Sequence, residues 1–116
     1  METFWNLKVA RKAHKLVLNV YKITRNFPKI ELYGLVPQMR RASISIIANI
    51  AEASKRHYKK DRIRFFIISN GSLEELKYYL ILSADLEYIS KIEQRDILEK
   101  CREVGAMLNG LINSLK

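Results

Sequence analysis

The segment QMRRASISIIANIAE, residues 38–52, most constrains how this chain can fold. If residues are placed at about 100° intervals, as in an α-helix, the polar side chains share one narrow stripe of the helix surface. The stripe holds Arg41, Ser45, Ala48, Asn49, Glu52 and Arg56. Apolar or small residues cover roughly 200° of the circumference, against the ~100° that is typical of a surface helix. The pattern predicts a helix over residues 37–56 that is either central in a core or shared between subunits, and for so short a chain we favour sharing.

The spacing of apolar residues predicts three further helices, and no segment has the alternation of a strand. These helices span residues 7–24, 60–86 and 93–115. The last has an apolar seam in steps of four and three, which is typical of a helix bundle, at Ile97, Cys101, Val104, Leu108, Leu111 and Leu115. With only four Gly and two Pro in 116 residues, long helices can run uninterrupted. We therefore predict an all-α fold in one domain, residues 1–116.

Two segments allow more than one interpretation. The sequence SNGS at residues 69–72 has the composition of a turn, but the apolar spacing continues through it in phase. We therefore predict one continuous helix, in which Gly71 lets a neighbouring helix approach closely. The connection at residues 25–35 is unusually apolar, and we expect it to fold back over one end of the core. An exposed partner-binding loop is the alternative.

Positive charge is concentrated in the first two-thirds of the chain. Residues 1–73 contain 15 Lys and Arg against 4 Asp and Glu, a net charge of +11. Residues 74–116 contain 6 against 8, a net charge of −2. Such a polarised surface attracts nucleic acid or anionic membranes through long-range electrostatics. The alternative is a basic protein whose charge is incidental.

Two features concern the compartment. No apolar run approaches the ~20 residues that are needed to cross a bilayer, and the N-terminal segment lacks the apolar core of a secretory signal. Cys101 is the only cysteine, so no intrachain disulfide can form, which fits a reducing environment. We expect a cytoplasmic protein that makes no use of a membrane.

The basic segment KRHYKKDRIR, residues 55–64, is the main candidate site. Its cations are Lys55, Arg56, Lys59, Lys60, Arg62 and Arg64, and one acid, Asp61, interrupts them. Phosphates favour this composition, and Tyr58 or His57 could stack on an unpaired base. We predict that Arg41 and, from the first helix, Lys12 and Lys15 extend this nucleic-acid-binding surface. The alternative is a polar corner between helices that serves only solubility.

Five polar residues are predicted to hold the helices together rather than to catalyse: Arg40, Ser45, Asn49, Glu52 and Glu75. Arg40 intrudes on the apolar arc, where an unpaired charge is costly, so we expect a carboxylate such as Glu75, or a neighbouring subunit, to pair with it. Ser45, Asn49 and Glu52 form a column without a histidine base. The two histidines and one cysteine are too few for a zinc site. We expect no enzymatic activity, no cofactor and no metal.

Two stretches, FPKIELYGLVPQMRRASISIIANIAE and RFFIISNGSLEELKYYL, strongly resemble the four-helix-bundle family of 23S rRNA-intervening sequence proteins. The matching residues are Phe27, Pro28, Glu31, Tyr33, Gly34, Leu35, Gln38, Arg40, Arg41, Ser45, Asn49, Ile50, Ala51, Glu52, Arg64, Phe65, Gly71, Ser72, Glu75 and Leu76. The chain departs from the family pattern at Ile47, where proline is usual, and at Ala53, where glycine is usual. The second helix should therefore be straighter. Lys77 stands where an acidic residue is usual, so a shared salt bridge is not expected there.

The resemblance implies an antiparallel up-and-down four-helix bundle that assembles as a barrel-like homopentamer. It also implies nucleic-acid binding without an established reaction. Related accessory proteins occur beside the reverse transcriptases of diversity-generating retroelements, so a reverse transcriptase is a candidate partner. Our leading hypothesis is a non-enzymatic, oligomeric accessory protein that binds nucleic acid, RNA in preference to DNA. The alternative is a structural or protein-interaction adaptor.

Overall fold

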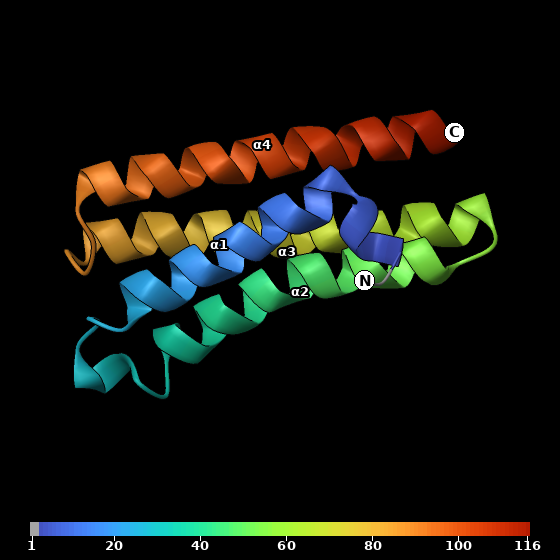
Figure 1. The fold of residues 1–116 in the computed structure, drawn as a ribbon. Coiled ribbons are helices and arrows are strands. Elements are labelled where there is room, and N and C mark those ends of the chain that lie inside the picture. The colour runs from blue at the N-terminus through green and yellow to red at the C-terminus, as the bar shows by residue number, and fades with distance from the viewer. Residues whose placement is uncertain (1–2) are drawn as a thin grey trace.

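The computed structural model describes residues 3–116, and these form four long α-helices with no strand among them. The helices are α1 (Lys8–Thr24), α2 (Leu35–Lys55), α3 (Lys59–Asp85) and α4 (Lys91–Leu115), and two short 3-10 turns are η1 (Thr3–Asn6) and η2 (Lys29–Glu31). They lie side by side in an elongated bundle of 44 × 23 × 22 Å (Figure 1). The predicted all-α fold and its four helices are thus confirmed. Within residues 3–116, no helix combines the length and apolar character that a bilayer span requires.

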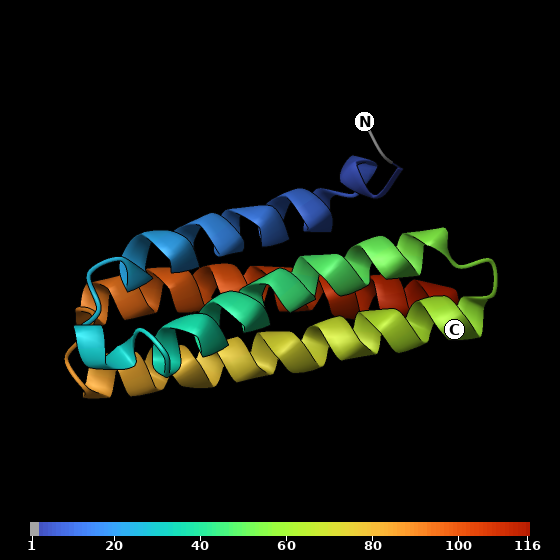
Figure 2. The ribbon, with the colours of Figure 1, turned by 90° about the horizontal axis from the view of Figure 1, so that it is seen from below.

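Contacts between helices show how the chain folds back on itself. Ser83 of α3 donates a hydrogen bond to the sulfur of Met39, whereas Ser69 of α3 donates to the backbone oxygen of Ile46. Residue numbers therefore fall along α3 as they rise along α2. Asn70 of α3 donates to Asn109 of α4 over 2.8 Å. Figure 2 shows α2 between α1 and α3.

Packing against α1 and α3 explains much of the wide apolar arc of α2. Seven of its apolar residues are buried within the same chain: Leu35, Val36, Met39, Ala42, Ile46, Ile50 and Ala53. Among the large apolar side chains of α2, only Ile44 is exposed. Packing against two neighbouring helices accounts for most of the arc, so sharing between subunits is not needed to explain α2. Among the four helices, α3 exposes the most large apolar side chains: Ile67, Ile68, Tyr78 and Ile81.

The SNGS sequence lies inside α3, as predicted, because its serines find partners across the helix interface. Ser69 is buried and bonded to Ile46, and the hydroxyl groups of Ser72 and Ser45 are 2.8 Å apart. The prediction for Gly71 is wrong, because a Cβ at this position would meet nothing within 4 Å. Gly105 of α4 is the glycine that admits a neighbour. A Cβ there would lie 3.2 Å from Cδ2 of Leu73.

The connection between α1 and α2 combines the two interpretations of its sequence. Phe27 and Leu35 are buried over the end of the core, whereas Ile30, Leu32 and Tyr33 are exposed. Glu31 fixes this turn, since one carboxylate oxygen accepts the backbone N–H of Leu35 (3.1 Å) and the other accepts the Tyr88 hydroxyl (2.7 Å).

The same carboxylate explains why α2 begins at Leu35, two residues earlier than predicted. The first N–H groups of a helix have no partner inside the helix, and Glu31 supplies one for Leu35 from outside. Pro37 lies in that first turn, where its missing N–H costs nothing.

Candidate nucleic-acid interface

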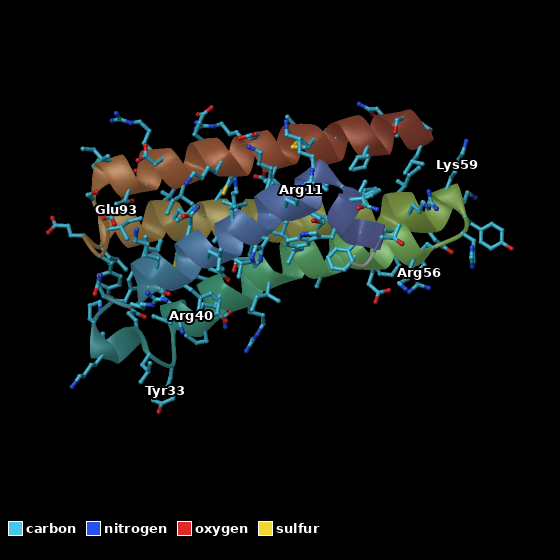
Figure 3. The ribbon with its side chains drawn as sticks, in the orientation of Figure 1. Arg11, Tyr33, Arg40, Arg56, Lys59 and Glu93 are labelled. Carbon is cyan, nitrogen blue, oxygen red and sulfur yellow. The ribbon has the colours of Figure 1, made fainter. Side chains whose placement is uncertain are left out.

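The predicted basic segment forms the corner where α2 ends and α3 begins, at one end of the bundle. Figure 3 labels Arg56 and Lys59 there. α2 ends at Lys55 because Arg56 adopts an extended backbone (φ −82°, ψ 143°), and Tyr58 before α3 is also extended (φ −96°, ψ 139°). The chain thus reverses direction over three residues, all of them polar or aromatic.

The arginines of this corner are held by contacts within the chain. Arg56 forms an ion pair with Glu52 (3.0 Å), and its guanidinium lies 4.6 Å from the ring centre of Phe65. The Arg64 guanidinium lies 5.0 Å from the centre of the same ring. Arg62 donates from Nε to the backbone oxygen of Arg56 over 2.8 Å. The arginines therefore keep their charge but also fix the corner.

Four consecutive residues between Arg56 and Arg62 are exposed: His57, Tyr58, Lys59 and Lys60. Tyr58 exposes 75% of its surface. Within residues 3–116, neither Lys59 nor Lys60 forms an ion pair. The corner thus presents ammonium groups and an aromatic ring to the solvent beside a fixed backbone.

A second cationic surface follows the outside of α1. Exposed cations recur at intervals of three, four or seven residues along this helix and just beyond it: Lys8, Arg11, Lys15, Lys22 and Arg25. We call this set the α1 line. It contains no acidic residue, since α1 has none, and Lys8 to Lys22 spans about 21 Å at 1.5 Å per residue. Only Leu18 interrupts it as an exposed apolar side chain.

Of the two α1 residues that we predicted, only Lys15 lies on this line. Lys12 turns toward α4, where its ammonium group forms an ion pair with Glu103 (2.9 Å). Lys8, Arg11, Lys22 and Arg25 extend this surface beyond Lys12 and Lys15, the two residues of the first helix that we named as candidate contacts. Their spacing of three, four or seven residues, in register with Lys15, was the signal that could have identified them.

The α1 line also influences the neighbouring helix electrostatically. The pKa of the Glu103 carboxyl is lowered, first by its hydrogen bond to Lys12, then by the charges of Lys12, Lys8 and Lys15. Cations that favour a carboxylate on α4 would favour a phosphate by the same attraction.

The partners of Arg40 differ from those we predicted. Its Nε donates to the Thr24 hydroxyl over 3.0 Å, and its guanidinium lies 4.3 Å from the ring centre of Tyr21. Both partners lie near the end of α1, because this side of α2 faces α1. Glu75 instead lies on α3, where it accepts a hydrogen bond from the Tyr79 hydroxyl (3.3 Å). The predicted pairing of Arg40 with Glu75 is therefore wrong. An aromatic face and a hydroxyl replace the carboxylate.

The polar column of α2 is divided between two roles. Asn49 donates to the backbone oxygen of Ser45 (2.8 Å) and to its hydroxyl (3.1 Å), and that hydroxyl also meets Ser72 of α3. Glu52 instead pairs with Arg56 at the corner.

Arg41 is exposed but lies fourteen residues before Lys55, roughly 21 Å away along the helix, so the structure does not join it to the corner.

The described residues offer little for chemistry. Among residues 3–116, no three His, Cys, Asp or Glu side chains lie close enough together to hold a metal ion. Cys101 is buried in the bundle, and burial raises the pKa of its thiol to about 12. The thiol therefore stays neutral near pH 7 and behaves as a small core side chain.

Comparison with known proteins places this fold and surface in context. A family model described as 23S rRNA-intervening sequence protein matches residues 5–110. The chain is also similar to a crystal structure, at 1.70 Å resolution, of a protein with unknown function from the S23 ribosomal protein family of Bacteroides thetaiotaomicron. The two share 26% sequence identity with a TM-score of 0.81, over 90% of this chain and 97% of the other. No curated protein matches the sequence.

Proposed function

The chain belongs to the family of 23S rRNA-intervening sequence proteins, and we propose that it is a non-enzymatic accessory protein that binds nucleic acid, RNA in preference to DNA. One observation carries the proposal. The α1 line, together with Lys59 and Lys60 of the corner, exposes cations that form no ion pair with an acidic residue within residues 3–116. Proteins bind nucleic acid chiefly by placing such cations against phosphates and releasing counterions.

We propose that the working form is a barrel-like homopentamer of antiparallel up-and-down bundles, located in the cytoplasm. The support is the family resemblance together with four exposed apolar side chains on one helix, Ile67, Ile68, Tyr78 and Ile81 of α3. Apolar surface of this kind favours association. At +9 per chain, a pentamer would carry a formal charge of +45 and present many cations to one polyanion.

A second candidate function is a protein-interaction adaptor, and one observation favours it. The turn before α2 exposes Ile30 and Tyr33 by 83% and 93%, although Glu31 holds the backbone of that turn in place. A fixed, exposed apolar turn suits contact with another protein. A reverse transcriptase is the partner that the family resemblance suggests.

The proposed RNA binding is tested by measuring affinity against salt with two matched variants. The first replaces four exposed cations of the α1 line and the corner: Lys15→Gln, Lys22→Gln, Lys59→Gln and Lys60→Gln. The control removes the same number of charges from the acid-rich C-terminal part: Lys91→Gln, Arg95→Gln, Lys100→Gln and Lys116→Gln. The slope of log affinity against log salt should fall by up to about 3 in the first variant, at about 0.7 per lost phosphate contact, and by less than 1 in the control. Equal losses in both variants would show that only net charge matters. If the wild-type chain binds no RNA at low salt, the adaptor function is preferred.

A further inference from the structure

The exposed ring of Tyr58 suggests what form of nucleic acid the corner accepts. We propose that Tyr58 stacks on an unpaired nucleobase, so that the α2–α3 corner binds single-stranded RNA and not the body of a duplex. The inference rests on the proposed function, because it names the class of RNA that the same surface would take.

Tyr58 differs from the other tyrosines that lie near the body of the bundle, because these have partners. Tyr21 lies beneath the Arg40 guanidinium, Tyr79 bonds to Glu75, and Tyr88 bonds to Glu31. The Tyr58 side chain has no hydrogen bond and no ring contact within residues 3–116, and it is 75% exposed. No contact inside the described chain therefore explains an aromatic side chain at this position.

The backbone that carries Tyr58 is fixed on both sides. Before it, the Arg56 carbonyl accepts Nε of Arg62, and the Arg56 side chain is held by Glu52 and Phe65. After it, α3 begins at Lys59, and the Tyr58 carbonyl accepts the backbone N–H of Arg62 (3.1 Å). A ring on a preorganised backbone loses little further freedom when a ligand covers it, which favours binding.

The neighbouring charges define the ligand. Lys59 and Lys60 follow the ring directly, and both are exposed. An aromatic face beside cations fits a base with its flanking phosphates, as in proteins that bind single strands. Inside a duplex the faces of the bases are covered by their neighbours, so only unpaired bases in loops, bulges and single-stranded ends can use the ring.

The chain itself contains a matched control. Tyr33 is even more exposed, at 93%, but it lies at the opposite end of the bundle from Lys59 (Figure 3). Its immediate neighbours are Leu32 and Gly34, not cations. If exposure of a tyrosine were enough, Tyr33 and Tyr58 would behave alike.

The experiment measures fluorescence anisotropy with three RNA probes of twelve units at one salt concentration: oligouridylate, a blunt duplex, and an abasic ribose-phosphate chain. Tyr58→Ala should weaken oligouridylate binding by about tenfold or more, because base stacking on an aromatic side chain is typically worth that much. Tyr58→Phe keeps the ring and should retain affinity within about twofold, and Tyr33→Ala should do the same. The duplex and the abasic chain should be insensitive to Tyr58→Ala. Circular dichroism confirms that each variant keeps its helices.

The outcomes separate this inference from the proposed function. If all three probes bind with the same salt dependence and Tyr58→Ala changes none of them, phosphate binding stands and the stacking inference is overturned. If Tyr58→Ala weakens the abasic chain as much as oligouridylate, the ring does not act on bases, and the inference is again overturned. If no probe binds, both proposals fall together.

Discussion

The two ends of the bundle differ in how they use their polar side chains. At one end, which we call the anchored end, the turns at residues 25–34 and 86–90 are joined by Glu31, Tyr88 and the ring contact of Tyr88 with Phe27 (5.1 Å between centres). A capping box closes the start of α4, where Ser90 and Glu93 exchange hydrogen bonds of 2.9 and 3.0 Å. Glu31 and Glu93 at this end thus both accept hydrogen bonds that hold the fold together.

At the other end, which we call the basic end, residues 56–60 carry arginine, histidine, tyrosine and two lysines with no acid among them. Only Arg56 of these has an ion pair within residues 3–116. The comparison teaches that a distinctive sequence motif need not mark a binding surface. In the FPKIELYGL segment at the anchored end, Phe27, Glu31 and Leu35 join helices while Ile30, Leu32 and Tyr33 are exposed, whereas four consecutive residues of the plainer basic segment, 57–60, are exposed.

The largest effect should follow from removing the aromatic contact of the anchored end. Phe27→Ala deletes a buried ring and should lower the free energy of unfolding by about 3–5 kcal/mol, measured in urea at one fixed protein concentration. Tyr58→Ala at the basic end is the matched control and should change it by no more than about 0.5 kcal/mol. Similar losses at both ends would break the comparison.

A smaller loss is expected from Glu31→Gln. The amide keeps one oxygen for the Leu35 N–H, but its NH₂ group cannot accept the Tyr88 hydroxyl, so about 1–3 kcal/mol should be lost. Tyr88→Phe removes only the second bond and should cost less. If the double variant loses no more than Glu31→Gln alone, the two groups act as one unit. A neutral Glu31→Gln would show that the carboxylate does not hold this turn.

Within the basic end, Arg56→Lys should separate folding from binding. Lysine keeps the charge but loses the planar group that lies over Phe65, so the chain should lose about 0.5–1 kcal/mol of stability. Affinity for RNA should stay within about twofold, because we assign phosphate contact to the lysines. A larger loss of affinity with unchanged stability would move Arg56 into the binding surface.

The helices could be predicted because their signal is local. Apolar spacing identified each of them, and carried α3 correctly through the SNGS sequence. The predictions that failed depended on which helices become neighbours in the folded chain. Arg40 was correctly placed on the apolar side of α2, but its partners Thr24 and Tyr21 could be known only once α1 was seen to lie against that side.

The candidate site shows the same limit. The sequence located the basic corner, but not that its arginines would be engaged by Glu52 and Phe65 while Lys59 and Lys60 stayed open. The start of α2 was missed because Glu31 is fixed in part by Tyr88, which lies 57 residues away in the chain. Lys12 and Lys15 are close in sequence, yet one faces α4 and the other the solvent.

The smallest predicted effect concerns the ion pair of Lys12 and Glu103, which lies between the two ends. The pKa of Glu103 is lower in the folded chain than in the unfolded chain, because Lys12 and the nearby lysines favour the carboxylate. The stabilisation is therefore present above the unfolded pKa, near 4.3, and is lost as pH falls through the folded pKa. At pH 7, Glu103→Gln should melt at a slightly lower temperature than the wild type, and the two melting curves should converge as pH falls below the folded pKa of Glu103. Added salt should shrink the difference, since both side chains are partly exposed. In a Lys12→Met background, Glu103→Gln should give a much smaller pH-dependent difference. A wild-type difference that does not change from pH 7 into the acid range would mean that packing, not charge, joins α1 to α4.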